Sequence, residues 1–136
     1  MKKIFFMTLF VTLSLLSACT NESNNGKTQS LEAFYKEANI EHVDQVIIQD
    51  GSTGASKTIT KQEDVNEFLS LVKEITFPPQ DNQEERIGWL YSITLFGGQK
   101  EFKFTLNHID NTYYDTSPDI YPIVENYYKQ LVTVEE

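Results

Sequence analysis

The sequence predicts a single α+β domain: an antiparallel sheet of four to five strands in an approximate ββα-ββα order, with helices packed on one face. Runs of β-branched and aromatic residues surround Gly-containing turns at 43–60 and 88–107. After each of these segments, at 60–77 and 117–131, apolar residues recur at helical spacing. The length of 136 residues is enough for one core and one domain.

The start of the chain has the pattern of an export signal. Residues 1–3 carry two lysines, residues 4–16 are uncharged and largely apolar, and two small residues precede Cys19. The apolar stretch has 13 residues. A membrane-spanning helix needs about 20, because the hydrocarbon core is about 30 Å thick. We therefore expect residues 1–18 to be a signal peptide that is removed.

The sequence LSAC at 16–19 resembles the bacterial lipobox. In that family the cysteine thiol receives a diacylglyceryl group and becomes the first residue of the mature chain. The resemblance implies that Cys19 is the lipidation site and that this covalent lipid anchors the protein on the outer face of the cytoplasmic membrane. The alternatives are an ordinary secretory signal beside a free cysteine and a buried structural cysteine. Lipidation would use the only thiol of the chain.

Residues 19–30 are expected to be a lipidated cysteine and a flexible polar tether, because 20–30 contain no large apolar side chain. The domain then occupies 31–136. Without the leader, nine basic residues remain against 20 acidic ones, so the net charge is −11. This charge argues against a nucleic-acid partner. It also repels anionic head groups, so attachment to the membrane should depend on the acyl chains.

The first expected element is a short helix over 31–38, where apolar residues have helical spacing and Ser30 is available as an N-cap. Residues 43–60 predict a hairpin with a longer loop, in which Gly51 and Gly54 supply permissive dihedrals. The GSTG sequence of this loop lacks the lysine and the glycine spacing of a phosphate-binding loop. We interpret it as a turn.

A second helix is predicted from Thr60, which has the spacing of a capping box with Glu63. Four apolar residues follow at helical spacing: Val65, Phe68, Leu69 and Val72. The helix should end before Pro78. Residues 78–88 are then expected to form an exposed acidic loop.

Residues 88–107 predict a β-hairpin that turns at Gly97 and Gly98, a pair suited to a type I′ turn. Counting outward from this turn gives the following apolar pairs: Ile93 with Phe102, Tyr91 with Phe104, and Trp89 with Leu106. Polar residues face polar ones on the other side, so one face should be buried. Trp89 and Tyr91 are therefore expected in the core.

Residues 108–116 are interpreted as a further short strand. The last helix is predicted within 117–131, where Pro122 is tolerable in the first turn. Its apolar residues with helical spacing are Ile120, Ile123, Val124, Tyr127 and Leu131.

Three stretches between Val43 and Leu131 resemble the small Bacillota lipoproteins that carry a YhfM-like domain. They are IIQDGSTG, GWLYSITLF preceded by Arg86, and NTYYDTSPDIYPIVENYYKQL. The resemblance implies a surface-anchored domain without an assigned enzymatic activity. It supplies no catalytic residue.

Residues that carry catalysis or bind metals are sparse. His42 and His108 fall in different predicted elements and match no HExxH or similar ligand spacing. Asp110, Asp115 and Asp119 do not form an EF-hand loop, and acidic turn residues usually act as caps. The sequence contains no GxSxG elbow or SxxK pair. We therefore expect no enzyme, no metal and no cofactor besides the lipid on Cys19.

Tyrosines are concentrated in the last quarter of the chain: Tyr113, Tyr114, Tyr121, Tyr127 and Tyr128. Neither alternation nor helical spacing buries all of them, so some should be exposed. Together with Arg86, the only arginine, Tyr113 and Tyr114 form the candidate contact surface. The alternatives are rim packing of the tyrosines around a small core, and an ion pair of Arg86 with Glu84 or Glu85.

These features together predict a non-enzymatic, membrane-anchored extracytoplasmic lipoprotein that acts as a binding module at the cell surface. Its expected partner, besides the membrane, is a cell-envelope protein or a small ligand. The alternatives are a cation- or small-ligand-dependent enzyme built on the acidic loops, and a structural spacer in the envelope.

Overall fold

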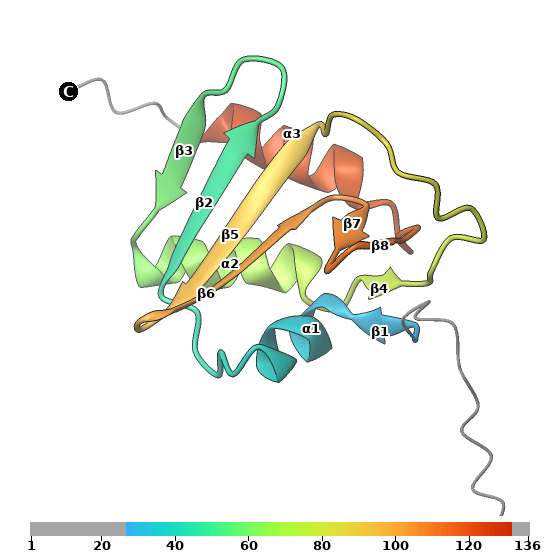
Figure 1. Cartoon of the computed structure of the whole chain (residues 1–136). Coiled ribbons are helices and arrows are strands. Elements are labelled where there is room, and N and C mark those ends of the chain that lie inside the picture. The colour runs from blue at the N-terminus through green and yellow to red at the C-terminus, as the bar shows by residue number, and fades with distance from the viewer. Residues whose placement is uncertain (1–26, 132–136) are drawn as a thin grey trace, which may run out of the picture.

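Antiparallel strand pairing organises the chain in the computed structural model, which describes residues 27–131 (Figure 1). The strands are β1 (Gln29–Ser30), β2 (Gln45–Asp50), β3 (Ser56–Ile59), β4 (Thr76–Phe77), β5 (Tyr91–Gly97), β6 (Lys100–Thr105), β7 (His108–Ile109) and β8 (Thr112–Tyr113). The helices are α1 (Leu31–Glu37), α2 (Gln62–Val72) and α3 (Ile120–Gln130). The main sheet has six strands in the order β3-β2-β5-β6-β7-β8, and β1 pairs with β4 in a separate two-stranded sheet.

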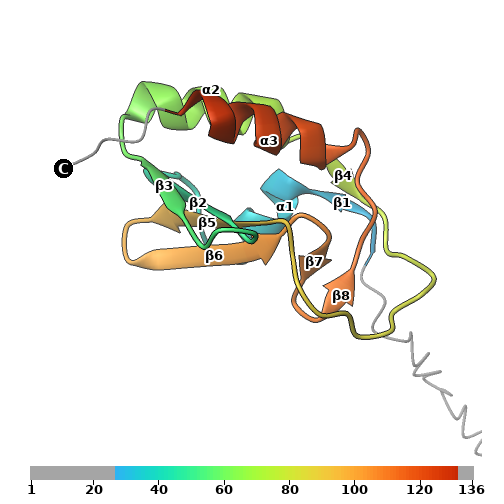
Figure 2. The same cartoon turned by 90° about the horizontal axis from the view of Figure 1, so that it is seen from above.

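The α+β class is confirmed, and Figure 2 shows α2 and α3 side by side on one face of the main sheet. The expected count of four to five strands is wrong, because the main sheet has six. The shortest strands, β1, β4, β7 and β8, have two residues each. Two residues are too few to show an alternating pattern, so such strands are defined by their partners and not by their own sequence.

Helices α1 and α3 begin as the sequence predicts. Ser30 caps α1, because its Oγ accepts a hydrogen bond from the backbone N–H of Ala33 at 3.1 Å. Asp119 caps α3 by accepting from the N–H of Tyr121 at 3.0 Å, and Pro122 lies in the first turn.

The predicted capping box of α2 is wrong. The helix begins at Gln62, and Lys61 occupies the N-cap position without a side-chain cap hydrogen bond. The side chain of Gln62 instead makes a tertiary contact, since its Nε2 donates to the carbonyl oxygen of Val43 at 3.1 Å. The apolar spacing nevertheless predicts the buried face of α2 correctly, which consists of Val65, Phe68 and Val72.

The β5–β6 hairpin forms, but its turn lies one residue later than predicted. Gly97 pairs with Lys100, and Ile93 pairs with Phe104 instead of Phe102. A shift of two positions keeps every side chain on its predicted face. A residue outside the hairpin contacts its turn: Gly98 N–H donates to Asp44 Oδ2 at 2.9 Å.

The core lies between the main sheet and the helices, and aromatic contacts connect its parts. Phe68 of α2 contacts Tyr127 of α3 with ring centroids 5.1 Å apart. Phe34 of α1 lies edge-to-face on Phe77 at 5.8 Å. Leu31 is fully buried in the same cluster, so α1 belongs to the domain core.

Several expectations concern the start of the chain. The expected signal peptide (1–18) and the expected lipidation site, Cys19, lie outside the described residues. Gln29 and Ser30, assigned to the end of the tether, form β1 by pairing with Phe77 and Thr76. No helix within residues 27–131 has the length and apolar character needed to cross a membrane.

Candidate functional site

Exposed apolar side chains are concentrated in the loop that joins β4 to β5. Four large hydrophobic residues are exposed within residues 27–131, and three of them lie here: Ile87 at 104%, Trp89 at 40% and Leu90 at 61%. We call these three residues the apolar tip. The fourth, Leu71, is on α2. Contiguous exposed apolar surface is typical of an interaction site, whereas a single exposed leucine is ordinary.

The prediction that Trp89 lies in the core is wrong, whereas Tyr91 is buried at 7% exposure as expected. β5 begins only at Tyr91, so the alternation that buries one face of the hairpin does not extend to Trp89. In the sequence, the apolar run 89–91 looks like the start of the strand. The available signal for an exposed tip was Gly88, whose φ of +87° interrupts an extended strand.

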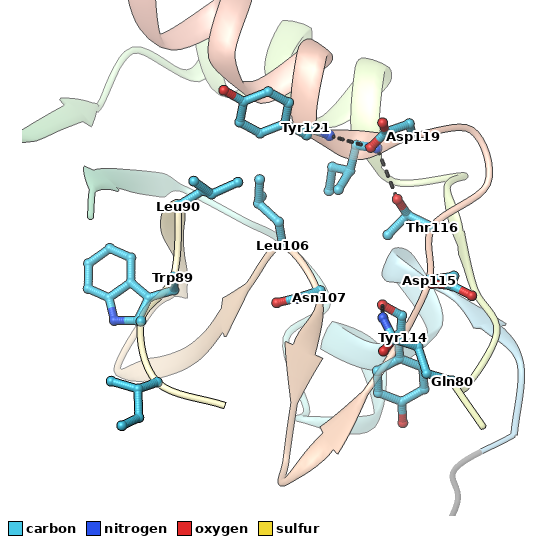
Figure 3. Close-up of a pocket in the computed structure, with 13 residues that line it drawn as sticks. Gln80, Trp89, Leu90, Leu106, Asn107, Tyr114, Asp115, Thr116, Asp119 and Tyr121 are labelled. Atoms are coloured by element: carbon cyan, nitrogen blue, oxygen red, sulfur yellow. Dashed lines mark hydrogen bonds between the residues drawn. The ribbon is translucent and has the colours of Figure 1, made fainter. Parts of the chain in front are cut away.

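A groove of about 750 Å³ lies beside the apolar tip (Figure 3). In the figure, Trp89 and Leu90 are on one side of it, Tyr114 and Asp115 are on the other, and Leu106 is between them. The start of α3 closes a third side with the following residues: Asp119, Ile120 and Tyr121. The volume is in the range of pockets that hold small molecules or the side chains of a partner.

A second hollow of about 570 Å³ also borders the loop. Its lining includes Arg86, His108 and Tyr113. Ile87 and Trp89 line both hollows. The apolar tip therefore presents contact surface to two adjoining depressions.

Tyr113 holds the middle of the β4–β5 loop against the main sheet. Its backbone N–H donates to Gln83 Oε1 at 2.8 Å, and Gln83 Nε2 donates back to its carbonyl oxygen at 2.9 Å. The backbone N–H of Arg86 donates to the Tyr113 hydroxyl at 2.8 Å. The loop is thus tied to β8 immediately before the apolar tip.

Gly51, in the β2–β3 turn, holds the other end of the tip. Its N–H donates to the carbonyl oxygen of Leu90 at 2.7 Å. A Cβ at this position would overlap the carbonyl oxygen of Trp89. The tip is therefore positioned from both sides before any partner arrives, which lowers the entropic cost of binding.

The predicted contact surface of Arg86, Tyr113 and Tyr114 is only partly assembled. Arg86 is exposed, and its guanidinium lies 4.5 Å from the centroid of the Tyr113 ring. Its Nη2 donates to the carbonyl oxygen of Asn82 at 2.9 Å. Within the described residues, Arg86 forms no ion pair with Glu84 or Glu85.

The expectation that some of the five tyrosines are exposed is wrong. Tyr121 is half-buried and the other four are buried, with exposures of 8% for Tyr113 and 4% for Tyr114. The ring of Tyr114 packs edge-to-face on Phe34 and Phe77. Segments distant in sequence cover both tyrosines, so the local spacing of β8 does not reveal their burial. Tyr114 therefore lies among the core residues, although it also borders the groove.

The groups with potential for metal binding or catalysis are dispersed. His42 Nε2 lies 3.1 Å from Gln62 Oε1, whereas the ring of His108 packs against Tyr113 with centroids 4.4 Å apart and an interplanar angle of 36°. Among residues 27–131, no group of three or more His, Cys, Asp or Glu side chains is placed to hold a metal ion. One oxygen of Asp119 is already used as the α3 cap.

Comparison of the chain with protein-family models, curated proteins and solved structures finds no match. The resemblance to YhfM-like domains stays a prediction.

Proposed function

We propose that this chain is a membrane-anchored extracytoplasmic binding module that holds a cell-envelope protein or a small ligand in the groove beside the apolar tip. The observation that carries the proposal is the exposure of Ile87, Trp89 and Leu90 on a loop that is tied down at both ends. Exposure of apolar side chains to water is unfavourable. A partner that covers them would lower the free energy of the system.

The anchor follows from the leader pattern and from Cys19. Two acyl chains on this residue would retain the domain at the bilayer without a basic surface. This agrees with the net charge of −11 that remains without the leader, which disfavours electrostatic binding to anionic lipids. A spacer without a partner would not require an exposed apolar tip.

The binding function is tested by crosslinking in intact cells of the source organism. A photoreactive amino acid replaces Ile87 in the full chain, and the matched control carries it at Leu71, which is 46% exposed on α2. We expect a recurrent crosslinked species at position 87 that is missing at position 71. The same products at both positions, or none at either, would contradict the proposal.

The anchor is tested separately with Cys19→Ser. We expect the unsubstituted chain to partition into the membrane and to have a mass increased by a diacylglyceryl group. The variant should lose both properties. If partition and mass are unchanged by the substitution, Cys19 is not the lipid attachment site.

A further inference from the structure

The groove combines an apolar lining with charged residues of one sign, both of them acidic. Trp89, Leu90 and Leu106 provide apolar surface. The charged residues of the lining are Asp115 and Asp119, and the lining contains no lysine, arginine or histidine. A ligand that matches this site has an apolar group next to a positive charge.

Two polar side chains of the groove are available to a ligand. Neither the carboxylate of Asp115 nor the side-chain amide of Asn107 has a hydrogen-bond partner within residues 27–131. Both residues are exposed. The carboxylate accepts hydrogen bonds from a cation, and the amide can both donate to and accept from a peptide backbone.

The charge of the whole chain disfavours other occupants. A second copy of this chain, with a net charge of −11 without the leader, would place like charges against the groove. Anionic lipid head groups and nucleic acids are repelled in the same way. A partner with lysine or arginine is attracted.

The surface is also larger than one small molecule would cover. Ile87 and Trp89 border both the groove of about 750 Å³ and the second hollow of about 570 Å³. A ligand that covers the whole apolar tip therefore borders both depressions. An extended polypeptide segment does this, whereas a small ligand fills only one.

We propose that the groove binds a polypeptide segment in which an apolar side chain is adjacent to lysine or arginine. The apolar side chain packs against Trp89 and Leu90, and the cation lies near Asp115. The inference rests on the proposed function, because it names the class of partner for the same groove.

Trp89 is the only tryptophan of the chain, so its fluorescence reports directly on this site. The full chain in non-ionic detergent is titrated with a synthetic peptide of alternating lysine and leucine. A second peptide has glutamate in place of every lysine. We expect a saturable shift of Trp89 emission with the lysine peptide, weaker at high salt, and none with the glutamate peptide.

Two pairs of matched variants test the site. Leu90→Ala should weaken binding about tenfold, whereas Leu71→Ala, also an exposed leucine, should leave it unchanged. Asp115→Asn combined with Asp119→Asn should weaken binding about fivefold. Glu67→Gln combined with Glu74→Gln changes the net charge equally on an exposed surface outside the groove and should have no effect.

Several results would overturn the inference. Equal binding of both peptides, no binding of either, or equal losses in the matched variants would exclude a cation-specific groove. Protection of Trp89 from acrylamide quenching in phosphatidylcholine vesicles without peptide would identify the membrane as the occupant. Protection that increases with protein concentration would identify a second copy.

The two proposals fail in different ways. If neither peptide binds but crosslinking at position 87 still captures a specific species in cells, the binding function stands and the cationic partner is wrong. If crosslinking also captures nothing, both proposals are wrong.

Discussion

The backbone of Trp89 lies against Gly51 so closely that residue 51 has no room for a side chain. A Cβ there would overlap the Trp89 carbonyl oxygen and lie 2.8 Å from Cε3 of the indole. The contact joins the β2–β3 turn to the β4–β5 loop, and the hydrogen bond from Gly51 N–H to Leu90 O supports it at 2.7 Å. It determines where the apolar tip stands beside the groove.

Gly51→Ala should therefore displace the tip. We expect the free energy of unfolding to fall by about 1–3 kcal/mol, as for other overpacked sites. Urea unfolding measures the loss, and Trp89 fluorescence reports the displacement. Gly54→Asn is the matched control in the same turn, because Gly54 has a positive φ that asparagine tolerates and open space around it. Equal stability of both variants and the parent would contradict the contact.

Gln83→Glu should loosen the loop at its attachment to β8. Gln83 Nε2 donates to the carbonyl oxygens of Gln80 and Tyr113 at 2.7 and 2.9 Å. A carboxylate at this position faces both oxygens without a proton, so we expect a loss of about 1–3 kcal/mol.

The two carbonyl oxygens disfavour the charged form and raise the pKa of the new carboxyl above its usual value. The loss caused by Gln83→Glu should therefore shrink as the pH falls toward about 4, because a protonated carboxyl can donate again. Urea unfolding across this range is the measurement. Gln99→Glu makes the same charge change in an exposed turn and should cost little. A loss that does not depend on pH would refute the role of the two donated hydrogen bonds.

Tyr35 should make the protein sensitive to alkaline pH. Burial, and secondarily the carboxylate of Glu32, raise the pKa of Tyr35 from 10.0 to about 12. Folding therefore favours the protonated phenol. The stabilisation is complete below about pH 10 and is lost as the pH rises from about 10 to about 12.

Tyr35→Phe keeps the ring and removes the titrating group. We expect the free energy of unfolding of this variant to decline less steeply between about pH 10 and 12 than that of the parent. The variant also loses the hydrogen bond from Tyr35 Oη to Glu32 Oε2, which is 3.4 Å long. This loss changes the free energy of unfolding by an amount that is already present at neutral pH. Parallel pH profiles of variant and parent would show that Tyr35 does not contribute.

Asp119 should stabilise α3 through its cap and not through its charge. Its Oδ1 accepts from the N–H of Tyr121 at 3.0 Å. We expect Asp119→Ala to lower the free energy of unfolding by about 0.5–2 kcal/mol, and Asp119→Asn, which keeps the acceptor, to change it little. Thermal unfolding compares the two. A loss for asparagine as large as that for alanine would assign the effect to the charge.

Local patterns along the chain predict much of this fold. The spacing of Val65, Phe68 and Val72 correctly predicts the buried face of α2, and Ser30 caps α1 as expected. The β5–β6 hairpin shows the limit of such patterns. Alternation defines its two faces but not its register, because a shift of two residues leaves the alternation unchanged. Asp44, a residue outside the hairpin, contacts the turn at Gly98.

The candidate site was less predictable than the fold. Arg86 and Tyr113 are in contact with each other, whereas their assignment to a contact surface stays a prediction. The exposed apolar residues of the groove were missed, because Trp89 continues the apolar pattern of β5 in the sequence, whereas the strand begins only at Tyr91. The position of the apolar tip depends on contacts of the loop with Tyr113 and Gly51, which are distant in sequence.

The sequence by itself determined the fold class and the faces of the long elements, because these follow from the 2.0- and 3.6-residue periods of strands and helices. Only the tertiary structure decided that Tyr114 is buried and Trp89 exposed. Burial of a residue depends on which distant segment covers it: Phe34 and Phe77 cover Tyr114, whereas the contact with Gly51 leaves much of the indole of Trp89 in solvent.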